Sequence, residues 1–489
     1  MNNKLQKLSL IALFAALFSY VLIRASGLSF THDESLSYTI IKGSPLWATS
    51  PNNHTLNTWL MGICSTLFGD RELSLRLPNV LAFLVFSTFV FLLLKGAKSS
   101  LFALLGAILM VVNPFLLDFF SIARGYGLSL GFMAASLYFF LRRDLSEHTG
   151  NSFLLDFTVA MFFAFLVLLS NLSAINFYLA LLAVFAVQYP LWAFLYRKGK
   201  TWQHLAFAGI LALASWSLKG SLTTLLQLSR ENQLYFGEKK LVGSLDSLIN
   251  CSFYFSTYPD GVNTIVKYAV IGLLATAVVT AAFQKFLHRR LQKVLSLILL
   301  ITAGFVAEHH LFGANYPAER TALIFIPLFG LAWYEMAAIW RQKLRPSLQP
   351  VSDWGLLALL ALPLVYHFAS NANLQYTHTW QYDAHTKDAM EVVARANSAI
   401  GDGTETISIS NSALFEPAIN YYREINKLTK VQPATRDPLN IHATFIYEFE
   451  ANELVPKDLE RVAEFRDIKT VLFRGKAAVA NIETENLPK

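Results

Sequence analysis

Residues 157–196 read FTVAMFFAFLVLLSNLSAINFYLALLAVFAVQYPLWAFLY and contain no charged side chain. A helix needs about 20 predominantly apolar residues to cross the hydrocarbon core of a bilayer. The stretch is long enough for two such helices, and a polar cluster lies in its middle, at Asn171-Leu-Ser-Ala-Ile-Asn176. We therefore predict two membrane-spanning helices here, joined by a turn at that cluster.

Further apolar stretches of spanning length lie on both sides of this pair. Together with the pair they predict eleven spans, and the fold class is therefore a polytopic α-helical membrane protein. The other nine spans are expected at 8–23, 77–94, 99–117, 125–141, 201–218, 268–284, 291–307, 321–340 and 354–370, of which 291–307 and 321–340 are the weaker candidates.

The composition excludes most other classes of protein. Of the 489 residues, 54% are apolar, 14% are aromatic and only 15% are charged, whereas an average soluble protein carries about 25% charged residues. A disordered, fibrous or ordinary soluble protein is therefore excluded. The two cysteines, Cys64 and Cys251, are too few for a disulfide scaffold or a zinc site, and we expect two isolated thiols rather than a pair.

Charge is divided unevenly along the chain. Residues 371–489 hold 13 Lys and Arg against 17 Asp and Glu, and the remaining residues hold 27 against 16. The positive excess belongs to the membrane part, where it reports topology and not nucleic-acid binding. Residues 1–27 have one alternative, a signal peptide cleaved near Ala25-Ser-Gly27, but Arg24 directly after the apolar run argues against cleavage.

The positive-inside rule gives an orientation. With the N-terminus in the cytoplasm, every short cytoplasmic loop is basic, and an odd number of spans then places the C-terminus outside. We expect an integral membrane protein. The basic residues concerned are Lys4, Lys7, Lys95, Lys98, Arg142, Arg143, Arg197, Lys198, Lys200, Lys285, Arg289, Arg290, Lys293, Arg341, Lys343 and Arg345.

Three segments between or after the spans are long. Two are outer loops, 24–76 and 219–267, and both are assigned to a membrane module at 1–370. The third, 371–489, has apolar runs of strand length only, so we predict a separate extracytoplasmic α/β domain there. Its expected strands are 404–410, 443–449 and 469–473, and its expected helices are 387–400 and 412–425.

Ionisable residues in a membrane protein mark its functional sites. Here the midplanes of the spans are nearly free of charge, and the charges gather at the outer ends. A transporter coupled to ions would place acids or broken helices near the midplane. We therefore expect an amphipathic substrate with its head at the outer interface. The charges are His32, Asp33, Glu34, His54, Arg71, Arg76, Asp118, Arg124, Glu308, His309, His310, Glu319 and Arg320.

The first outer loop carries the strongest local signal, Thr31-His32-Asp33-Glu34. By itself this acidic pair is typical of a solvated loop end. However, the segment 54–69 that follows places Leu56, Trp59, Leu60, Ile63 and Leu67 on one helical face, which predicts an interfacial amphipathic helix.

Several motifs follow one another along the chain: Asp33-Glu34, His54 with its helix, Phe68-Gly69, Leu75-Arg76-Leu-Pro78, Asn113-Pro-Phe-Leu-Leu117, Ala123-Arg-Gly-Tyr126 and Glu319-Arg320 with Pro327. In this order they resemble the C-type membrane glycosyltransferases, specifically the family 39 group of protein O-mannosyltransferases and the aminoarabinose transferase of lipid A. The resemblance covers roughly the first 340 residues. Many relatives carry His-Pro-Pro where this chain has Asn53-His54-Thr55, and commonly Arg-Tyr where it has Arg320-Thr321.

The resemblance implies transfer of a sugar from a polyprenyl phosphate to an acceptor hydroxyl on the outer face of the membrane. A phosphate leaves without a proton, so the reaction needs a base for the acceptor and cations for the phosphate. By resemblance, Asp33 is the base. Arg124 and Arg320 are the expected phosphate ligands, because a guanidinium matches phosphate geometry, although an Arg at a span end often only reaches toward headgroups. The expected mechanism is inverting.

The other candidates have weaker support. Glu34 is predicted to assist catalysis or to cap the helix that follows, and His54, Tyr126 and Glu319 are predicted to bind substrate. Glu308, His309 and His310 with His32 are residue types that bind metals, but their spacing matches no zinc signature, so a divalent ion stays an alternative and no cofactor is assigned. The expected partners are the lipid-linked donor, a lipid, glycan or protein acceptor, and membrane lipids.

Two other classes of function fit the same span pattern. A lipid-linked sugar flippase or exporter would share the multi-span frame but would not need Asp33. A non-catalytic envelope assembly protein would act through its C-terminal domain alone.

Overall fold

The computed structural model describes residues 3–44, 50, 53–97, 99–283, 290–400 and 406–476. The chain divides into two compact units. One unit, called the bundle below, comprises Met1–Leu22, His54–Asn57 and Pro78–Ala372. The other, called the C-terminal unit, comprises Ile23–Asn53, Thr58–Leu77 and Asn373–Lys489. The helices α1 (Asn3–Gly27), α3 (Thr55–Phe68) and α4 (Glu72–Leu94) contribute residues to both units.

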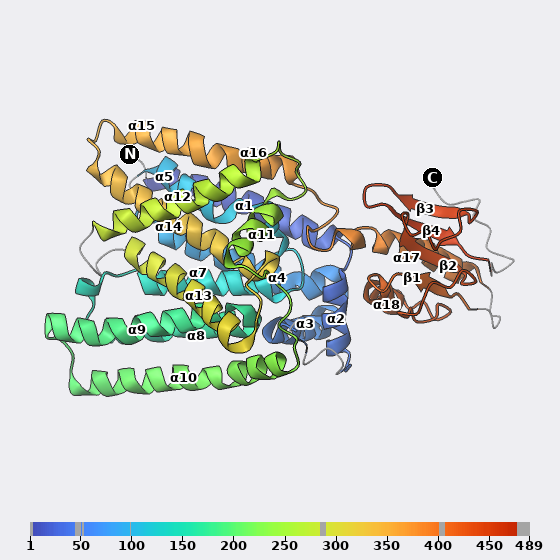
Figure 1. Ribbon diagram of the computed structural model, residues 1–489, viewed down its shortest axis with the longest axis horizontal. Helices are drawn as coiled ribbons and strands as arrows, with labels where there is room; N and C mark the ends of the chain where they lie inside the picture. The colour runs from blue at the N-terminus through green and yellow to red at the C-terminus, as the bar shows by residue number, and fades with distance from the viewer. Residues whose placement is uncertain are drawn as a thin grey trace. The chain divides into compact units, whose positions relative to one another are not determined.

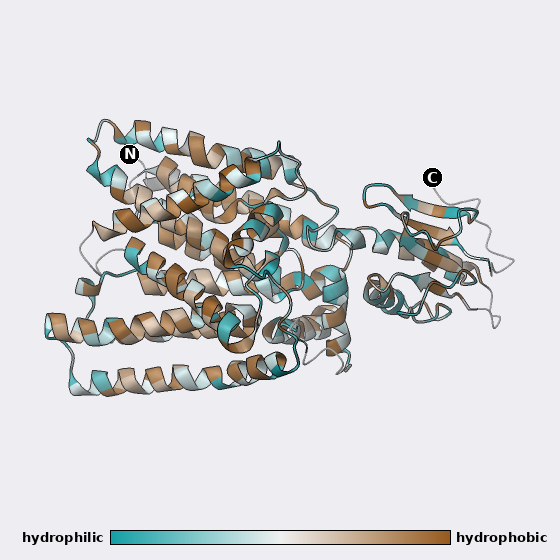
Figure 2. Cartoon of the chain, in the orientation of Figure 1, coloured by the Kyte–Doolittle hydropathy of each residue, from teal (hydrophilic) through white to brown (hydrophobic). Residues whose placement is uncertain are grey.

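The bundle is built from long apolar helices, which are brown over most of their length in Figure 2. In the described part of the chain, nine helices are long and apolar enough to cross a membrane, and the expected spans 99–117 and 125–141 are represented by shorter apolar helices. The bounds are α5 (Ser100–Val111), α6 (Pro114–Asp118), α7 (Gly125–Leu141), α8 (Gly150–Ser170), α9 (Ile175–Tyr196), α10 (Thr201–Arg230), α11 (Leu241–Phe253), α12 (Val262–Ala282), α13 (Arg290–Phe312), α14 (Phe325–Lys343), α15 (Gln349–Leu356) and α16 (Leu362–Asn371). Short 3₁₀ turns are η1 (Leu145–Glu147), η2 (Leu172–Ala174) and η3 (Glu319–Ala322), and the π-helical segment η4 (Leu357–Ala361) joins α15 to α16.

The uncharged stretch 157–196 forms two helices, as predicted. α8 ends at Ser170, and the Asn171 side chain accepts hydrogen bonds from the Ser173 backbone N–H (3.2 Å) and the Ser173 hydroxyl (2.8 Å), which closes the turn before α9 begins. Asn competes with the helix for backbone hydrogen bonds and therefore favours such a turn. α8, α9 and α10 then lie side by side (Figure 1).

The expected span 99–117 is interrupted. α5 ends at Val111, and the Asn113 side chain caps the short helix α6 by accepting from the Leu116 N–H at 3.0 Å. Pro114 at the first position of α6 has no N–H to donate, so a single helix through this point would lose a hydrogen bond. α6 and the bend after it lead directly to Arg124 at the start of α7.

α14 packs against α5 near the centre of the bundle. Gly330 allows this approach, because a Cβ there would overlap the backbone carbonyl of Leu109. The second long outer loop is shorter than expected, since α10 continues to Arg230 and α11 occupies 241–253 of the segment 219–267.

The C-terminal unit contains a four-stranded sheet with the strand order β1-β2-β4-β3. β1 pairs with β2 in parallel, and the other pairs are antiparallel. The α/β domain is therefore confirmed, and β3 is an element that the sequence analysis missed. The bounds are α17 (Thr386–Ala399), β1 (Ile409–Asn411), α18 (Glu416–Ile425), β2 (Phe445–Phe449), β3 (Arg461–Phe465), β4 (Thr470–Arg474) and the short turn η5 (Gln381–Asp383). The first two residues of the predicted strand 404–410 lie outside the described residues.

Most of the first outer loop, all but His54–Asn57, belongs to this unit and not to the bundle, which differs from the division expected from the sequence. α2 (His32–Ile41) packs against α18. The Phe30 N–H donates to the Tyr422 hydroxyl at 2.7 Å, and the Phe30 and Tyr421 rings stack at 4.0 Å. The Arg24 guanidinium donates to the Tyr376 carbonyl at 2.6 Å. The loop thus packs against residues more than 300 positions later in the chain.

Candidate functional site

His54 lies at the start of α3, in the bundle, and is buried with 3% of its surface exposed. Its Nδ1 lies 2.9 Å from the carbonyl oxygen of Ser170, at the end of α8, and its ring meets Tyr126 edge to face at 4.6 Å. Gly125 makes this packing possible, because a Cβ there would overlap the Ser170 carbonyl and crowd the His54 ring. Two of the predicted substrate-binding residues, His54 and Tyr126, are therefore in contact.

A polar network holds the start of α7 beside this contact. The Asn57 side chain donates to the Ala123 carbonyl at 2.8 Å, and the Asn79 side chain donates to Asn57 at 2.7 Å. Asn79 also accepts from the Leu128 N–H at 3.2 Å. Buried amides that are satisfied in this way rigidify the backbone around them. They fix the position of Arg124, which precedes α7 and is buried with 1% exposure. The sequence analysis gave neither asparagine a role.

Arg320 lies in the turn η3 that precedes α14. Its neighbour Glu319 has a positive φ of 47°, and the Glu319 N–H donates to the Ser247 hydroxyl at 2.9 Å, which holds the turn. The Arg320 guanidinium lies over the Phe236 ring at 4.5 Å and contacts the Glu319 carboxylate at 3.4 Å. A guanidinium is weakly hydrated and stacks readily on an aromatic face, so this position is suited to Arg rather than Lys.

Arg124 and Arg320 both lie within electrostatic range of the His54 ring. Burial lowers the pKa of His54 well below its usual value, and the positive charges of Arg124 and Arg320 lower it further. His54 is therefore neutral at neutral pH. Arg124 is buried and Arg320 is partly exposed, and two positive charges near one site favour an anionic ligand.

Two acidic residues of the bundle that the sequence analysis noted are held by neutral donors. The Tyr254 hydroxyl donates to Asp118 at 2.8 Å, and the Asn176 amide donates to Glu308 at 2.9 Å. His309 lies 2.8 Å from the Ala314 carbonyl and stacks on Tyr316. In the described part of the chain, no three His, Cys, Asp or Glu side chains form a group that could hold a metal ion. The metal alternative for Glu308, His309, His310 and His32 therefore gains no support. Both cysteines are free.

Glu34 has a structural partner in the C-terminal unit. It accepts from the Thr31 N–H at 3.0 Å and so caps α2. Both of its oxygens also accept from Arg76, at 2.7 and 2.8 Å. Arg76 and Glu34 are fully buried, and the remaining donors of Arg76 bind the carbonyls of Ala25, Leu28 and Ser29. Of the two roles expected for Glu34, the structure provides the capping one.

Asp33 occupies the second position of α2 and is buried with 6% exposure. The C-terminal domain supplies a third carboxylate nearby, because Asp383 accepts from the His32 N–H at 2.7 Å. Burial raises the pKa of Asp383 well above its usual range, and the negative charges of Asp33 and Glu34 raise it further. The sequence analysis missed Asp383 because nothing local distinguishes it from any other acid of that domain.

The structure thus groups the predicted site residues into two sets. His54, Arg124, Tyr126, Glu319 and Arg320 belong to the bundle, and Asp33 and Glu34 belong to the C-terminal unit.

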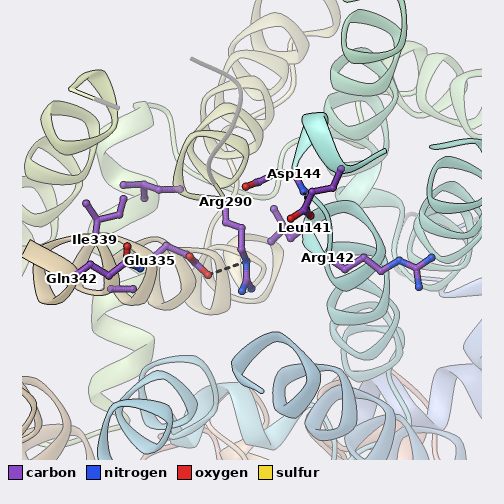
Figure 3. Close-up of a pocket in the computed structure, with 10 residues that line it drawn as sticks. Leu141, Arg142, Asp144, Arg290, Glu335, Ile339 and Gln342 are labelled. Carbon is purple, nitrogen blue, oxygen red and sulfur yellow. Dashed lines mark hydrogen bonds and ion pairs between the residues drawn. The ribbon is translucent and has the colours of Figure 1, made fainter. Parts of the chain in front are cut away.

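A separate cavity of about 410 Å³ lies between α7, α13 and α14. It contains the Arg290–Glu335 ion pair (3.1 Å), whereas Arg142 points away from that pair (Figure 3) and binds Asp156 instead. None of the predicted site residues lines this cavity.

Part of the chain matches a family of known proteins. Residues 54–218, which include His54, Arg124 and Tyr126, match the family described as dolichyl-phosphate-mannose-protein mannosyltransferase. A comparison with curated protein sequences found no significant match.

Solved structures show the same fold. ArnT from Cupriavidus metallidurans bound to undecaprenyl phosphate superposes with a TM-score of 0.54 at 11% identity, over 96% of this chain and 99% of that chain. The same protein in the apo state gives 0.52 at 12% identity, over 96% and 98%. A weaker likeness, with a TM-score of 0.47 at 14% identity, is to an oligosaccharyltransferase of Archaeoglobus fulgidus, over 91% and 66%.

The predicted C-type glycosyltransferase fold is therefore confirmed over nearly the whole chain, and the protein is an integral membrane protein. The family match and the fold together support a membrane glycosyltransferase.

Proposed function

We propose that the protein transfers a sugar from a polyprenyl-phosphate donor to an acceptor hydroxyl at the outer face of the membrane, with inversion at the anomeric carbon. The observation that carries the proposal is the placement of two arginines, the buried Arg124 and the partly exposed Arg320, within electrostatic range of the buried His54 ring. A phosphate monoanion between the arginines would offset their mutual repulsion and accept hydrogen bonds from both. Undecaprenyl phosphate is the lipid bound in the ArnT structure named above.

Each residue has a distinct role in this mechanism. Arg124 and Arg320 hold the phosphate and stabilise the charge that develops on it as the anomeric bond breaks. Asp33 removes the proton of the acceptor hydroxyl, and that oxygen forms the new bond to the anomeric carbon. No general acid is needed, because the polyprenyl phosphate leaves as an anion. Glu34 supports the reaction by holding α2, which carries Asp33.

The positive-inside pattern supports a cytoplasmic N-terminus and an extracytoplasmic C-terminal domain. The resemblance to C-type glycosyltransferases favours a bacterial inner membrane. Of the basic residues on which this orientation rests, Lys98, Lys285 and Arg289 lie outside the described residues. The acceptor is a lipid, a glycan or a protein.

The test is sugar transfer by the full chain in proteoliposomes. The donors are undecaprenyl phosphate carrying mannose, glucose, galactose or aminoarabinose, with an envelope extract as the source of acceptor. The measurements are the release of undecaprenyl phosphate and the mass of the glycosylated product. We expect transfer from one donor, and loss of that transfer in an Arg124→Gln, Arg320→Gln double variant. Arg345→Gln, which changes an exposed arginine, is the matched control.

The result that contradicts the proposal is the absence of transfer from every donor. Movement of the labelled lipid across the bilayer without any transfer would favour the flippase or exporter class instead.

A further inference from the structure

His54 presents one ring nitrogen whose hydrogen-bonding role the structure determines. The Nδ1 atom lies 2.9 Å from the Ser170 carbonyl oxygen. A carbonyl oxygen can only accept a hydrogen bond, so Nδ1 must carry the proton and donate it. Because the ring is buried and lies near two arginines, it carries no second proton at neutral pH. The other nitrogen, Nε2, therefore holds a lone pair and acts only as an acceptor.

Nothing in the described part of the chain uses that acceptor. The Nε2 atom is buried and has no hydrogen-bond partner among the described residues. A buried polar atom without a partner has a free-energy cost, and in native proteins it usually indicates an absent ligand or water. The ligand group that meets Nε2 must donate a hydrogen bond. A polyprenyl phosphodiester has no proton to donate, so the phosphate is excluded as its partner, and a hydroxyl satisfies it.

We propose that His54 Nε2 accepts a hydrogen bond from a hydroxyl of the donor sugar, next to the phosphate held by Arg124 and Arg320. This inference rests on the proposed function and makes His54 a specificity-determining residue for the sugar. The arginines bind the lipid phosphate regardless of the sugar attached to it. His54 contacts one hydroxyl of that sugar. A site that forms a hydrogen bond to a substrate hydroxyl discriminates strongly against an analogue that lacks this hydroxyl.

Two substitutions of His54 test the roles of its two ring nitrogens separately. Asn places its amide N–H₂ near the position of Nδ1, so it keeps the bond to Ser170 and removes the acceptor at Nε2. Gln reaches further and places an amide oxygen near Nε2, so it keeps an acceptor there. We expect His54→Asn to impair recognition of the sugar and His54→Gln to retain much of it.

The experiment measures binding of two probes to the purified full-length protein without any acceptor. One probe is bare undecaprenyl phosphate, and the other is the glycosylated lipid that the wild-type protein uses in the transfer assay. We expect His54→Asn to weaken binding of the glycosylated lipid about fivefold to tenfold, the size of one hydrogen bond. We expect bare undecaprenyl phosphate to bind as it does to the wild type. Arg124→Lys should weaken binding of both probes, and thermal unfolding checks that each variant is folded.

Two results would overturn the inference. If His54→Asn weakens binding of bare undecaprenyl phosphate as strongly as Arg124→Lys does, His54 binds the phosphate. If His54→Asn slows transfer while both probes bind normally, His54 contacts the acceptor and not the donor sugar. In both cases the arginine variants still test the proposed function independently. If the arginine variants bind both lipids normally, the proposed function fails instead.

Discussion

Arg76 in the C-terminal unit and the pair Arg124 and Arg320 in the bundle lie in different electrostatic surroundings. In the C-terminal unit, Arg76 donates five hydrogen bonds, two to Glu34 and three to backbone carbonyls, so all of its donors have partners within the unit. In the bundle, the charges that act on His54 are those of Arg124 and Arg320, which have the same sign as the imidazolium and oppose its formation. A saturated ion pair is typical of structural support. A buried cluster of positive charge is typical of a binding site for an anion.

The two acids of the first outer loop, Asp33 and Glu34, are therefore expected to have different roles. Glu34 is occupied by Arg76 and by the start of α2. Asp33, one residue earlier, is in the same buried segment but is not part of that saturated pair. Adjacent residues on a helix point about 100° apart, so one can bind the scaffold while the other faces elsewhere.

The largest expected effect is that of Asp33→Asn. The substitution keeps the shape of the side chain and removes its basicity, and a positioned base contributes about 10²–10⁴-fold in rate. We expect sugar transfer in proteoliposomes to fall by that factor, with donor binding and thermal unfolding close to wild type. Asp437→Asn, at an exposed position of the same unit, is the control. Normal transfer by the Asp33 variant would refute the assignment of the base.

The next effect concerns stability. Glu34→Gln leaves the buried Arg76 charge without its counter-charge, and breaking a buried ion pair in this way costs about 3–5 kcal/mol. We expect a clear drop in the thermal unfolding temperature and a smaller loss of activity than for Asp33→Asn. The double variant Glu34→Gln, Arg76→Gln should recover part of the stability. A Glu34 variant that is stable but inactive would show that Glu34 acts directly on the substrate.

A smaller effect is expected for Arg124→Lys and Arg320→Lys tested singly. Lys keeps the charge but loses the planar pair of donors, and one charged hydrogen bond contributes about 1.5–3 kcal/mol. Transfer should fall about tenfold to a hundredfold in each variant. The readout is transfer at saturating and limiting donor, which separates donor binding from turnover. Unchanged kinetics in both variants would show that these arginines contact lipid headgroups and do not bind the donor phosphate. The functional difference from Arg76 would then not hold.

The smallest effect is a pH dependence in the C-terminal unit. His385 bonds Asp388 at 2.6 Å and Asp467 at 3.0 Å, and these bonds raise its pKa. A raised pKa in the folded state stabilises the protein below the pKa of the unfolded state, and this contribution is lost as the pH rises through the folded-state pKa. We expect a loss of about 1 kcal/mol or less above about pH 6.5, because the partners are exposed.

The measurement for His385 is thermal unfolding of the full-length protein across that pH range, with His385→Gln as the comparison. The variant should lose the pH-dependent part of the stability and keep the rest. An identical pH dependence in both proteins would show that other groups cause it.

The elements of the fold could be predicted well, and the site only in part. Asn171 and Ser99 mark helix boundaries through their own side chains, so local sequence is sufficient to place them. β3 was missed, because its five residues (RVAEF) include two charges and show no apolar alternation, and its place in the sheet depends on pairing with β4. The roles of Asn57, Asn79 and Asp383 could not be predicted, since each bonds a partner that is distant in the sequence.

The sequence by itself determined that this is a membrane protein of many helices with an α/β domain at its C-terminal end, because apolarity, charge and turn residues act over short distances along the chain. Only the tertiary structure decided that the first outer loop packs with the C-terminal domain and that Glu34 pairs with Arg76. It likewise decided that the Ser170 carbonyl sets the proton on His54 and that Arg124 and Arg320 lie near that ring. These contacts form between segments that are distant in the sequence and come together only when the helices pack. A local pattern of residues therefore cannot predict them.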